Sequence, residues 1–413
     1  MTTVTLEKRA GDLRTIGLVG GGHFFSHFFL LCLPPLFPIL HLELGMSFTA
    51  LGGLMSAYAL AAGVGLMPVG FVVDRHGAPW PLIGGLTLLS GSFALMALVD
   101  GYWGLLALAF SAGLGNSVFH PADYAILNAR VSERRLGRAF AAHTFSGYLG
   151  FAAAPLVIVG LAELVGWRFA LGLCGLAGLA MAVILLAQRT RLNDSGHESA
   201  REAKATARGE SVPSNLSRVL TPGLILLFAF FMANAMTTMG IQSQSISSLI
   251  GLYGLELADA RYALTLFLIS AAAGVIAGGV LIDRTSRYDL LTAVAFLMAS
   301  AGLGAIGLFH PPYGIVLGVM MVAGFLLGAM VPTRDMMVRA FAPPGSIGKV
   351  YGLMSIGIEI SAVGAPLLMG WFIDHALPQG VFIACGVFLL GSFAASQVAA
   401  RRLRSAKAED SPI

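Results

Sequence analysis

Charged residues are scarce in this 413-residue chain. Asp, Glu, Lys and Arg together make up 11% of it, whereas hydrophobic residues make up 57%. A soluble domain averages about 25% charged residues, and its core could not take up this much apolar surface. The scarcity of charge excludes an ordinary soluble protein and predicts that most of the chain contacts lipid or other membrane helices.

Cysteine is also rare. Cys32, Cys174 and Cys385 lie in three separate hydrophobic runs, and neither their odd number nor their spacing fits a set of ligands or bridges. They exclude a disulfide framework, and we interpret them as small core residues.

The short motifs of enzymes are missing. The chain contains no Gly-x-Ser-x-Gly, no His-Glu-x-x-His and no Gly-x-x-x-x-Gly-Lys-Ser/Thr, which argues against hydrolase, zinc peptidase and ATPase activity. We therefore expect no enzyme and no cofactor. The net charge of +4 is spread between apolar runs rather than gathered in one patch, so we expect no nucleic-acid partner.

Long apolar runs are what the chain has instead. Each of twelve runs is long enough to cross a hydrocarbon core about 30 Å thick as a helix, which takes about 20 residues. We expect these helices at about 16–40, 48–72, 80–99, 102–126, 136–163, 166–188, 222–250, 259–281, 289–309, 312–334, 348–374 and 378–402.

The two halves of the chain repeat each other at a spacing near 210 residues. The run GFVVDRHG at 70–77 has a counterpart in GVLIDRTSR at 279–287, and Pro121 and Pro332 are 211 residues apart. A duplicated half is typical of membrane transporters. We predict an all-α integral membrane protein with twelve transmembrane helices in two pseudo-symmetric six-helix halves. These halves are 1–188 and 222–413, joined by a polar cytoplasmic linker at 189–221.

Lys and Arg predict the orientation. With the N-terminus inside, 23 of the 25 basic residues fall on the cytoplasmic side, since only Arg168 and Arg261 fall outside. Cytoplasmic loops carry the excess of basic residues in membrane proteins. We expect a multi-pass protein of the cell's inner (cytoplasmic) membrane, monomeric in the lipid bilayer, with both termini in the cytoplasm.

The DRxG loop between the second and third of twelve spans resembles that of the major facilitator superfamily, and the resemblance covers essentially the whole chain. The stretches GHFFSH at 22–27, APWP at 78–81 and GLGNSVFHP at 113–121 resemble the fosmidomycin-resistance branch of that family. The resemblance implies efflux of small, often anionic or drug-like compounds against proton entry. Members of this branch often carry an acidic residue near the position of His27, and this chain departs from them there.

The same resemblance implies that charged residues at cytoplasmic helix ends hold the helices of each half together. Arg75 would pair with Asp123, and Asp335 would lie beside Arg284 in the second half. The other interpretation is ordinary charge at the membrane boundary. The expected gating residues are Gly70, Asp74, Arg75, Gly77, Asp123, Asp283, Arg284, Arg334 and Asp335.

Glu359 is the first candidate for proton coupling. It lies 11 residues past Gly348, about 16 Å into the membrane at 1.5 Å per residue and close to the middle of the core. Charge is costly at that depth, so an ionisable residue there suggests function. The alternative is a protonated carboxyl that only hydrogen-bonds a neighbouring helix.

Four histidines within spans are the rival proton carriers. His23 and His27 are four residues apart, on one face of the first helix, and His120 and His143 lie in the fourth and fifth spans. Histidines can line a water-filled path and titrate, or can simply hydrogen-bond between helices. The His-x-x-x-His spacing can also hold a metal, but no third ligand follows from spacing. We therefore expect no metal site.

Neutral polar residues form a stripe in the seventh span, at Asn234, Thr237, Thr238 and Ser245. Such a stripe lines a substrate cavity or bonds helices together, and we favour the cavity. The expected substrate-binding residues are His23, His27, Asn116, His120, Asn234, Thr238, Gln242 and Glu359. The expected proton-coupling residues are Glu359, His120 and His143. Pro34, Pro35 and Pro38 should bend the outer end of the first helix.

Together these patterns predict a secondary active transporter of small organic solutes. We expect a proton-coupled exporter that works by alternating access, with the solute and protons as its partners. Two alternatives stay open: a proton-coupled importer of a monocarboxylate-like metabolite, and a membrane sensor that has a transporter fold and does not transport.

Overall fold

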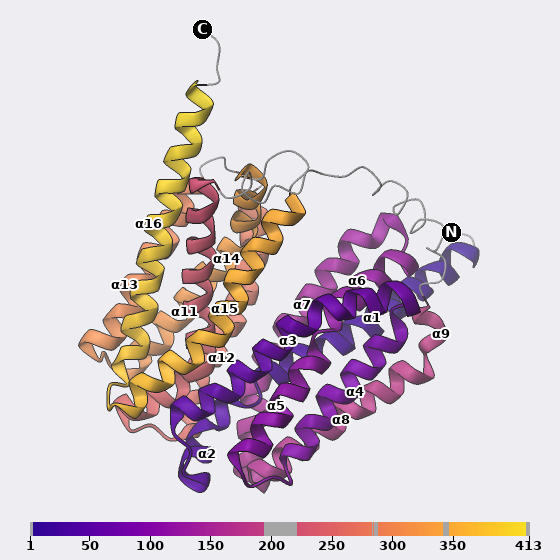
Figure 1. Cartoon of the computed structure of the whole chain (residues 1–413), viewed down its shortest axis with the longest axis horizontal. Helices are drawn as coiled ribbons and strands as arrows, with labels where there is room; N and C mark the ends of the chain where they lie inside the picture. Colours follow the sequence, from indigo (N-terminus) through magenta and orange to yellow (C-terminus); the bar gives the residue numbers. More distant parts are fainter. Residues whose placement is uncertain (1–2, 194–220, 283, 285–287, 342–346, 410–413) are drawn as a thin grey trace. The chain divides into compact units, whose positions relative to one another are not determined.

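A computed structural model describes residues 3–193, 221–282, 284, 288–341 and 347–409, and within these residues the chain is helical (Figure 1). Two compact units divide the chain: unit 1 comprises Met1–Ile39 and Ala57–Ser214, and unit 2 comprises Leu40–Ser56 and Asn215–Ile413. The first part of the chain folds into α1 (Thr3–Leu30), η1 (Pro34–Leu36), α2 (Phe37–Leu44), α3 (Phe48–His76), α4 (Pro79–Met96), α5 (Tyr102–Asn116), α6 (Phe119–Arg130), α7 (Glu133–Val165), α8 (Trp167–Ala187) and α9 (Arg189–Leu192). The second part folds into α11 (Pro222–Tyr253), α12 (Leu257–Ile282), α13 (Tyr288–Phe309), α14 (Tyr313–Phe341), α15 (Ile347–Asp374) and α16 (Gln379–Glu409).

The twelve predicted spans are confirmed. In the described part of the chain, 12 helical segments are long and apolar enough to cross a membrane, and each coincides with a predicted span to within several residues at either end. Large apolar side chains such as Phe71, Trp103 and Phe309 are exposed on the outside of these helices. An exterior of this kind would aggregate in water and suits a lipid environment. Residues 194–220, most of the predicted linker, lie outside the described residues.

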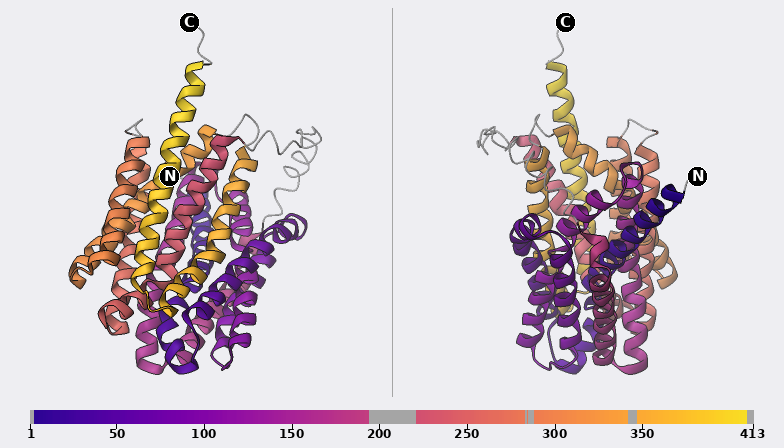
Figure 2. Two further views of the ribbon diagram at one scale, coloured as in Figure 1. Left: turned by 60° about the vertical axis from the view of Figure 1, so that its left-hand side comes forward. Right: turned by 90° about the vertical axis from the view of Figure 1, so that its right-hand side faces the viewer.

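The same helix pairings occur in both units. In unit 1, α1 packs on α7 and α4 packs on α8; in unit 2, α11 packs on α15 and α13 packs on α16. In each half, therefore, the first span packs on the fifth span and the third span packs on the sixth. Figure 2 shows the helices of unit 2 running alongside one another, with the last turns of α16 extending beyond its neighbours. The repeated pairing agrees with the predicted duplication.

Individual glycine contacts repeat as well. A Cβ on Gly113 of α5 would strike the carbonyl oxygen of Tyr58 in α3, and a Cβ on Gly324 of α14 would strike the carbonyl oxygen of Phe267 in α12. The two glycines are 211 residues apart and their partners are 209 apart. Each contact lets two helix backbones touch, which is how membrane helices commonly pack.

Prolines interrupt two of the spans. The first span breaks between α1 and α2, where Pro34 and Pro35 form the short helix η1, as the sequence predicts. The fourth span breaks between Asn116 and Phe119, because Pro121 has no N–H to bond the carbonyl group of Ser117 and its ring crowds that carbonyl. The second break sets the start of α6, the helix that carries His120 and Asp123.

Candidate functional site

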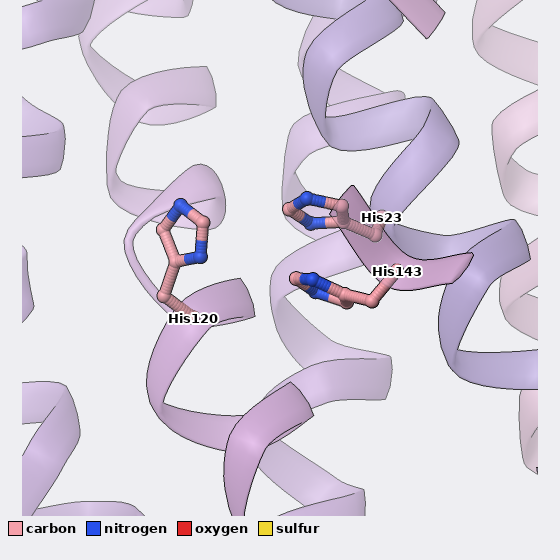
Figure 3. A group of neighbouring side chains, drawn as sticks. All are labelled: His23, His120 and His143. Carbon is pink, nitrogen blue, oxygen red and sulfur yellow. The ribbon is translucent and has the colours of Figure 1, made fainter. Parts of the chain in front are cut away.

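Four histidines and one aspartate from three helices of unit 1 come together. α1 contributes His23 and His27, α6 contributes His120 and Asp123, and α7 contributes His143. We call these five residues the histidine–aspartate cluster. Residues three or four apart in a helix share one face, so each of α1 and α6 presents two members. Figure 3 shows the rings of His23 and His143 one above the other, with His120 opposite them.

Asp123 is the centre of the cluster. His143 Nε2 lies 2.9 Å from Asp123 Oδ2 in a buried hydrogen bond, and His23 Nδ1 lies 3.3 Å from the same oxygen. The side chain of Asp123 is 0% exposed, and those of His23 and His143 are 2% exposed. A carboxylate at this depth loses several kcal/mol of hydration, roughly, and needs compensating partners. Within the described residues, its ion-pair partners are histidines.

Ring contacts bind the remaining members into one group. The His23 and His143 rings stack with centroids 3.6 Å apart and an angle of 21° between their planes. The His27 ring lies 4.4 Å from that of His23, and the His120 ring lies 5.3 Å from it. His120 is exposed whereas His23 and His143 are buried. The cluster therefore has an enclosed part and one open side.

The cluster leaves some of its polar atoms without partners. Asp123 Oδ1 and His27 Nδ1 are buried, and neither atom forms a hydrogen bond with a described residue. A buried unsatisfied polar group costs about 1–3 kcal/mol. An arrangement that only held helices together would not need these extra groups, so the cluster is a candidate for binding protons or ligands.

Two glycines of α7 allow α1 to approach this closely. A Cβ on Gly147 would lie 2.9 Å from His23 Nε2 and 3.0 Å from His27 Nδ1. A Cβ on Gly150 would strike the backbone carbonyl oxygen of Phe24 and lie 3.0 Å from Phe28 N. Gly147 thus makes room for the two rings, and Gly150 lets the two helix backbones touch.

The structure brings together the four histidines that the sequence singled out and adds Asp123 to them. The resemblance placed Asp123 in the cytoplasmic gate with Arg75. In the structure its carboxylate is fully buried beside His143 and His23, and Arg75 is exposed near the end of α3. A pairing of Arg75 with Asp123 stays a prediction.

The predicted residues of unit 2 lie on α11 and α15. Glu359 of α15 is half-buried, Asn234 and Thr238 of α11 are also partly exposed, and Gln242 is buried. Thr237 donates a hydrogen bond to the carbonyl oxygen of Cys385 in α16, 3.1 Å away. This contact supports the interpretation that Thr237 bonds two helices together rather than lining a cavity. Asn116 lies in unit 1 at the end of α5, with its Oδ1 buried.

The predicted gating residues are only partly described. Asp74 and Arg75 are exposed at the end of α3, and the φ of 81° at Gly77, which favours glycine, ends that helix. Gly70 is a helical residue with open space around it. Arg284 is exposed. The guanidinium group of Arg334 lies 5.0 Å above the ring of Phe231. Asp283 and the side chain of Asp335 lie outside the described residues.

Sequence reasoning missed the place of Asp123 among the histidines and a second site in unit 2. At that second site the carboxylate of Asp374, at the end of α15, accepts hydrogen bonds from Phe48 N at 2.7 Å and Thr49 N at 2.8 Å, in the first turn of α3. The three-residue step from His120 to Asp123 could have signalled the first, because it puts both on one helix face. Nothing in the sequence links Asp374 to Thr49.

Comparisons with known proteins agree with this architecture. The model of the Major Facilitator Superfamily matches residues 19–258 and 243–412. The fosmidomycin resistance protein of Escherichia coli (strain K12) is 25% identical over 390 residues, covering 91% of this chain and 90% of that protein. The hexuronate transporter of Bacillus subtilis (strain 168) is 24% identical over 369 residues, covering 86% and 85%. A crystal structure of a bacterial homolog of the human lysosomal transporter Spinster superposes with a TM-score of 0.78 at 15% identity, covering 96% of this chain and 98% of that one.

Proposed function

This chain belongs to the Major Facilitator Superfamily, and we propose that it is a proton-coupled exporter of small organic solutes whose coupling group is the histidine–aspartate cluster. The observation that carries the proposal is the fully buried carboxylate of Asp123, 2.9 Å from His143 Nε2 and 3.3 Å from His23 Nδ1. Alternating access between the two halves would expose such a site to one side of the membrane at a time.

Burial makes the cluster sensitive to a single proton. With neutral imidazoles and an ionised Asp123, the cluster carries a charge of −1, and one added proton brings it to zero. A unit charge interacts far more strongly with its surroundings in a protein interior than in water. The two protonation states therefore differ in their preference for a closed or a hydrated site, which is what coupling requires.

His120 is the member best placed to meet a solute, because it is exposed on the open side of the cluster. A neutral imidazole accepts a hydrogen bond from a solute hydroxyl or amide group, whereas a protonated one cannot. Such a solute and a proton compete for His120, and competition for one site produces antiport. This reasoning supports export driven by proton entry.

The second candidate is a proton-coupled importer of a small organic anion. The four imidazoles that share the cluster with one carboxylate favour it, because a second bound proton would give the cluster a positive charge that attracts an anion. Proton and anion would then bind together and move together. One relative at the quoted level of identity is named a fosmidomycin resistance protein and another a hexuronate transporter, so a drug-related protein and a transporter of an organic acid both occur among similar chains.

Proteoliposomes containing a trapped pH-sensitive dye separate the two candidates. Fosmidomycin or D-glucuronate is added outside without an imposed gradient. Antiport makes the interior more alkaline as solute enters and protons leave, whereas symport makes it more acidic. A radiolabelled solute that stays outside in every case would instead support the non-transporting sensor.

Substitutions test the role of the cluster in the same assay. His143→Gln keeps a hydrogen-bonding side chain but cannot titrate, so we expect solute exchange to continue while the pH change disappears. The matched control is His41→Gln, since His41 bonds the carbonyl oxygen of Met46 at 2.7 Å and lies outside the cluster. A pH signal of normal size in His143→Gln would end the assignment of coupling to this cluster.

A further inference from the structure

We propose that the histidine–aspartate cluster is also a binding site for a divalent transition-metal ion of the zinc class, with His23, His120, His143 and Asp123 as ligands. One nitrogen from each of the three histidines lies within 4.8 Å of the others (Figure 3). The sequence led us to expect no metal here because spacing supplied only His23 and His27. The fold supplies the missing ligands from α6 and α7.

Two of the three imidazoles already have the spacing of zinc ligands around Asp123. Ligand atoms about 2.0–2.1 Å from a tetrahedral zinc ion lie about 3.3 Å from one another. Asp123 Oδ2 is 2.9 Å from His143 Nε2 and 3.3 Å from His23 Nδ1. One nitrogen from each of His23, His120 and His143 lies within 4.8 Å of the other two, so bringing the His120 nitrogen to the zinc-ligand spacing from them takes a shift of at most about 1.5 Å, which a side-chain rotation of the exposed His120 can supply.

The kind of donor selects the kind of ion. Three imidazole nitrogens and one carboxylate oxygen are typical of zinc and its neighbours in the transition series, whereas Mg²⁺ and Ca²⁺ take oxygen ligands. The ionised Asp123 offsets one of the two positive charges of the ion, and an intramembrane charge needs such a partner. His120 provides the entry path, because the cluster is open on its side.

The surroundings fix which nitrogen of His23 faces Asp123. Its Nε2 faces α7, where a Cβ on Gly147 would lie 2.9 Å away, so its Nδ1 faces Asp123. His27 lies behind His23 with ring centroids 4.4 Å apart and a buried, unbonded Nδ1. Groups behind a ligand orient it and tune its affinity. Among the described residues, His23, His120 and His143 form the single group of three or more ligand side chains close enough to share an ion.

Equilibrium binding to the purified full-length chain tests the proposal without any assumption about proton coupling. The protein carries an affinity tag free of histidine and is stripped of metal in detergent. Calorimetric titration with Zn²⁺ should give one site per chain. Titration with Co²⁺ should give the visible absorption of a four-coordinate ion, and excess Zn²⁺ should remove it while excess Mg²⁺ should not.

Single substitutions then identify the ligands. We expect His120→Gln and His143→Gln each to weaken Zn²⁺ binding by about 100-fold or more, since even a group behind a ligand accounts for about 10–100-fold. His27→Gln should weaken it within that smaller range, and His41→Gln should leave it unchanged. If a ligand variant does not fold, the proposal is tested by the Zn²⁺ affinity of His27→Gln and by the absorption spectrum of Co²⁺ bound to the wild type. Absence of a stoichiometric site in the wild type, or binding that survives both ligand substitutions, would overturn the proposal.

Discussion

The packing of α7 on α1 makes a quantitative prediction for three glycine-to-alanine substitutions in one helix. Gly150→Ala places a methyl group against the backbone of α1, where the carbonyl oxygen of Phe24 cannot rotate away. Gly147→Ala places the same group 2.9–3.0 Å from the rings of His23 and His27. Gly137→Ala is the matched control, because nothing lies within 4 Å of its Cβ position.

The expected free energies of unfolding follow from these contacts. Alanine is favoured over glycine inside a helix by about 1 kcal/mol, so Gly137→Ala should stabilise the protein by up to that amount. At Gly150 the helices must separate, and overpacking with loss of close contacts costs about 3 kcal/mol. Gly150→Ala should therefore be less stable than Gly137→Ala by about 3 kcal/mol.

Gly147→Ala separates stability from function. Side-chain rings can shift where a backbone cannot, so its free energy of unfolding should stay within about 1 kcal/mol of the wild type. Its displaced His23 and His27 rings should nevertheless weaken the pH change that accompanies transport. Unfolding is measured by titration with a denaturing detergent, and transport in dye-loaded proteoliposomes. Equal stability of the Gly150→Ala and Gly137→Ala variants would refute the contact between α1 and α7.

Other parts of the molecule make further predictions. If the cluster is the coupling group, Glu359→Gln should keep proton-driven flux in proteoliposomes. A variant that loses this flux but still exchanges solute would show that Glu359 is the coupling group. Asp374→Ala should lower the free energy of unfolding by about 1–2 kcal/mol, because it removes the carboxylate that caps α3. Asp100→Asn is its control: Asp100 pairs with Arg168 but is 85% exposed, so the change should stay within about 0.5 kcal/mol. Asp74→Asn should slow transport in a flux assay with solute affinity nearly unchanged, and a wild-type rate would show that Asp74 is ordinary boundary charge.

The helices were predictable because the membrane imposes their length. A span must bury its own backbone groups and cross about 30 Å of hydrocarbon, so apolar runs bounded by charge or glycine are sufficient to locate it. The repeat was predictable because landmarks such as Pro121 and Pro332 keep their spacing. The breaks were partly predictable: Pro34 and Pro35 lie between α1 and α2, where a bend was expected, whereas Pro121 interrupts the fourth span and Pro332 lies inside the continuous helix α14.

The cluster was only half predictable. The four-residue step from His23 to His27 and the three-residue step from His120 to Asp123 each place two groups on one helix face, and both can be found from sequence. That the two faces meet depends on the packing of α1, α6 and α7, which connects residues about 100 positions apart. From sequence, depth in the membrane alone made Glu359 the first candidate for proton coupling. The burial of Asp123 and its pairing with histidines favour the cluster as the coupling group.

A purely structural role accounts poorly for the composition of the cluster. One hydrogen bond between His143 and Asp123 would be enough to join α7 to α6. Replacing such a buried pair with apolar side chains is often neutral or stabilising, so packing alone gives no reason to keep it. The cluster adds three further imidazoles, which repel one another whenever more than one is protonated, and leaves Asp123 Oδ1 without a hydrogen bond. Binding would give these destabilising groups a role, and the chemistry of the donors fits a proton or a zinc-class ion.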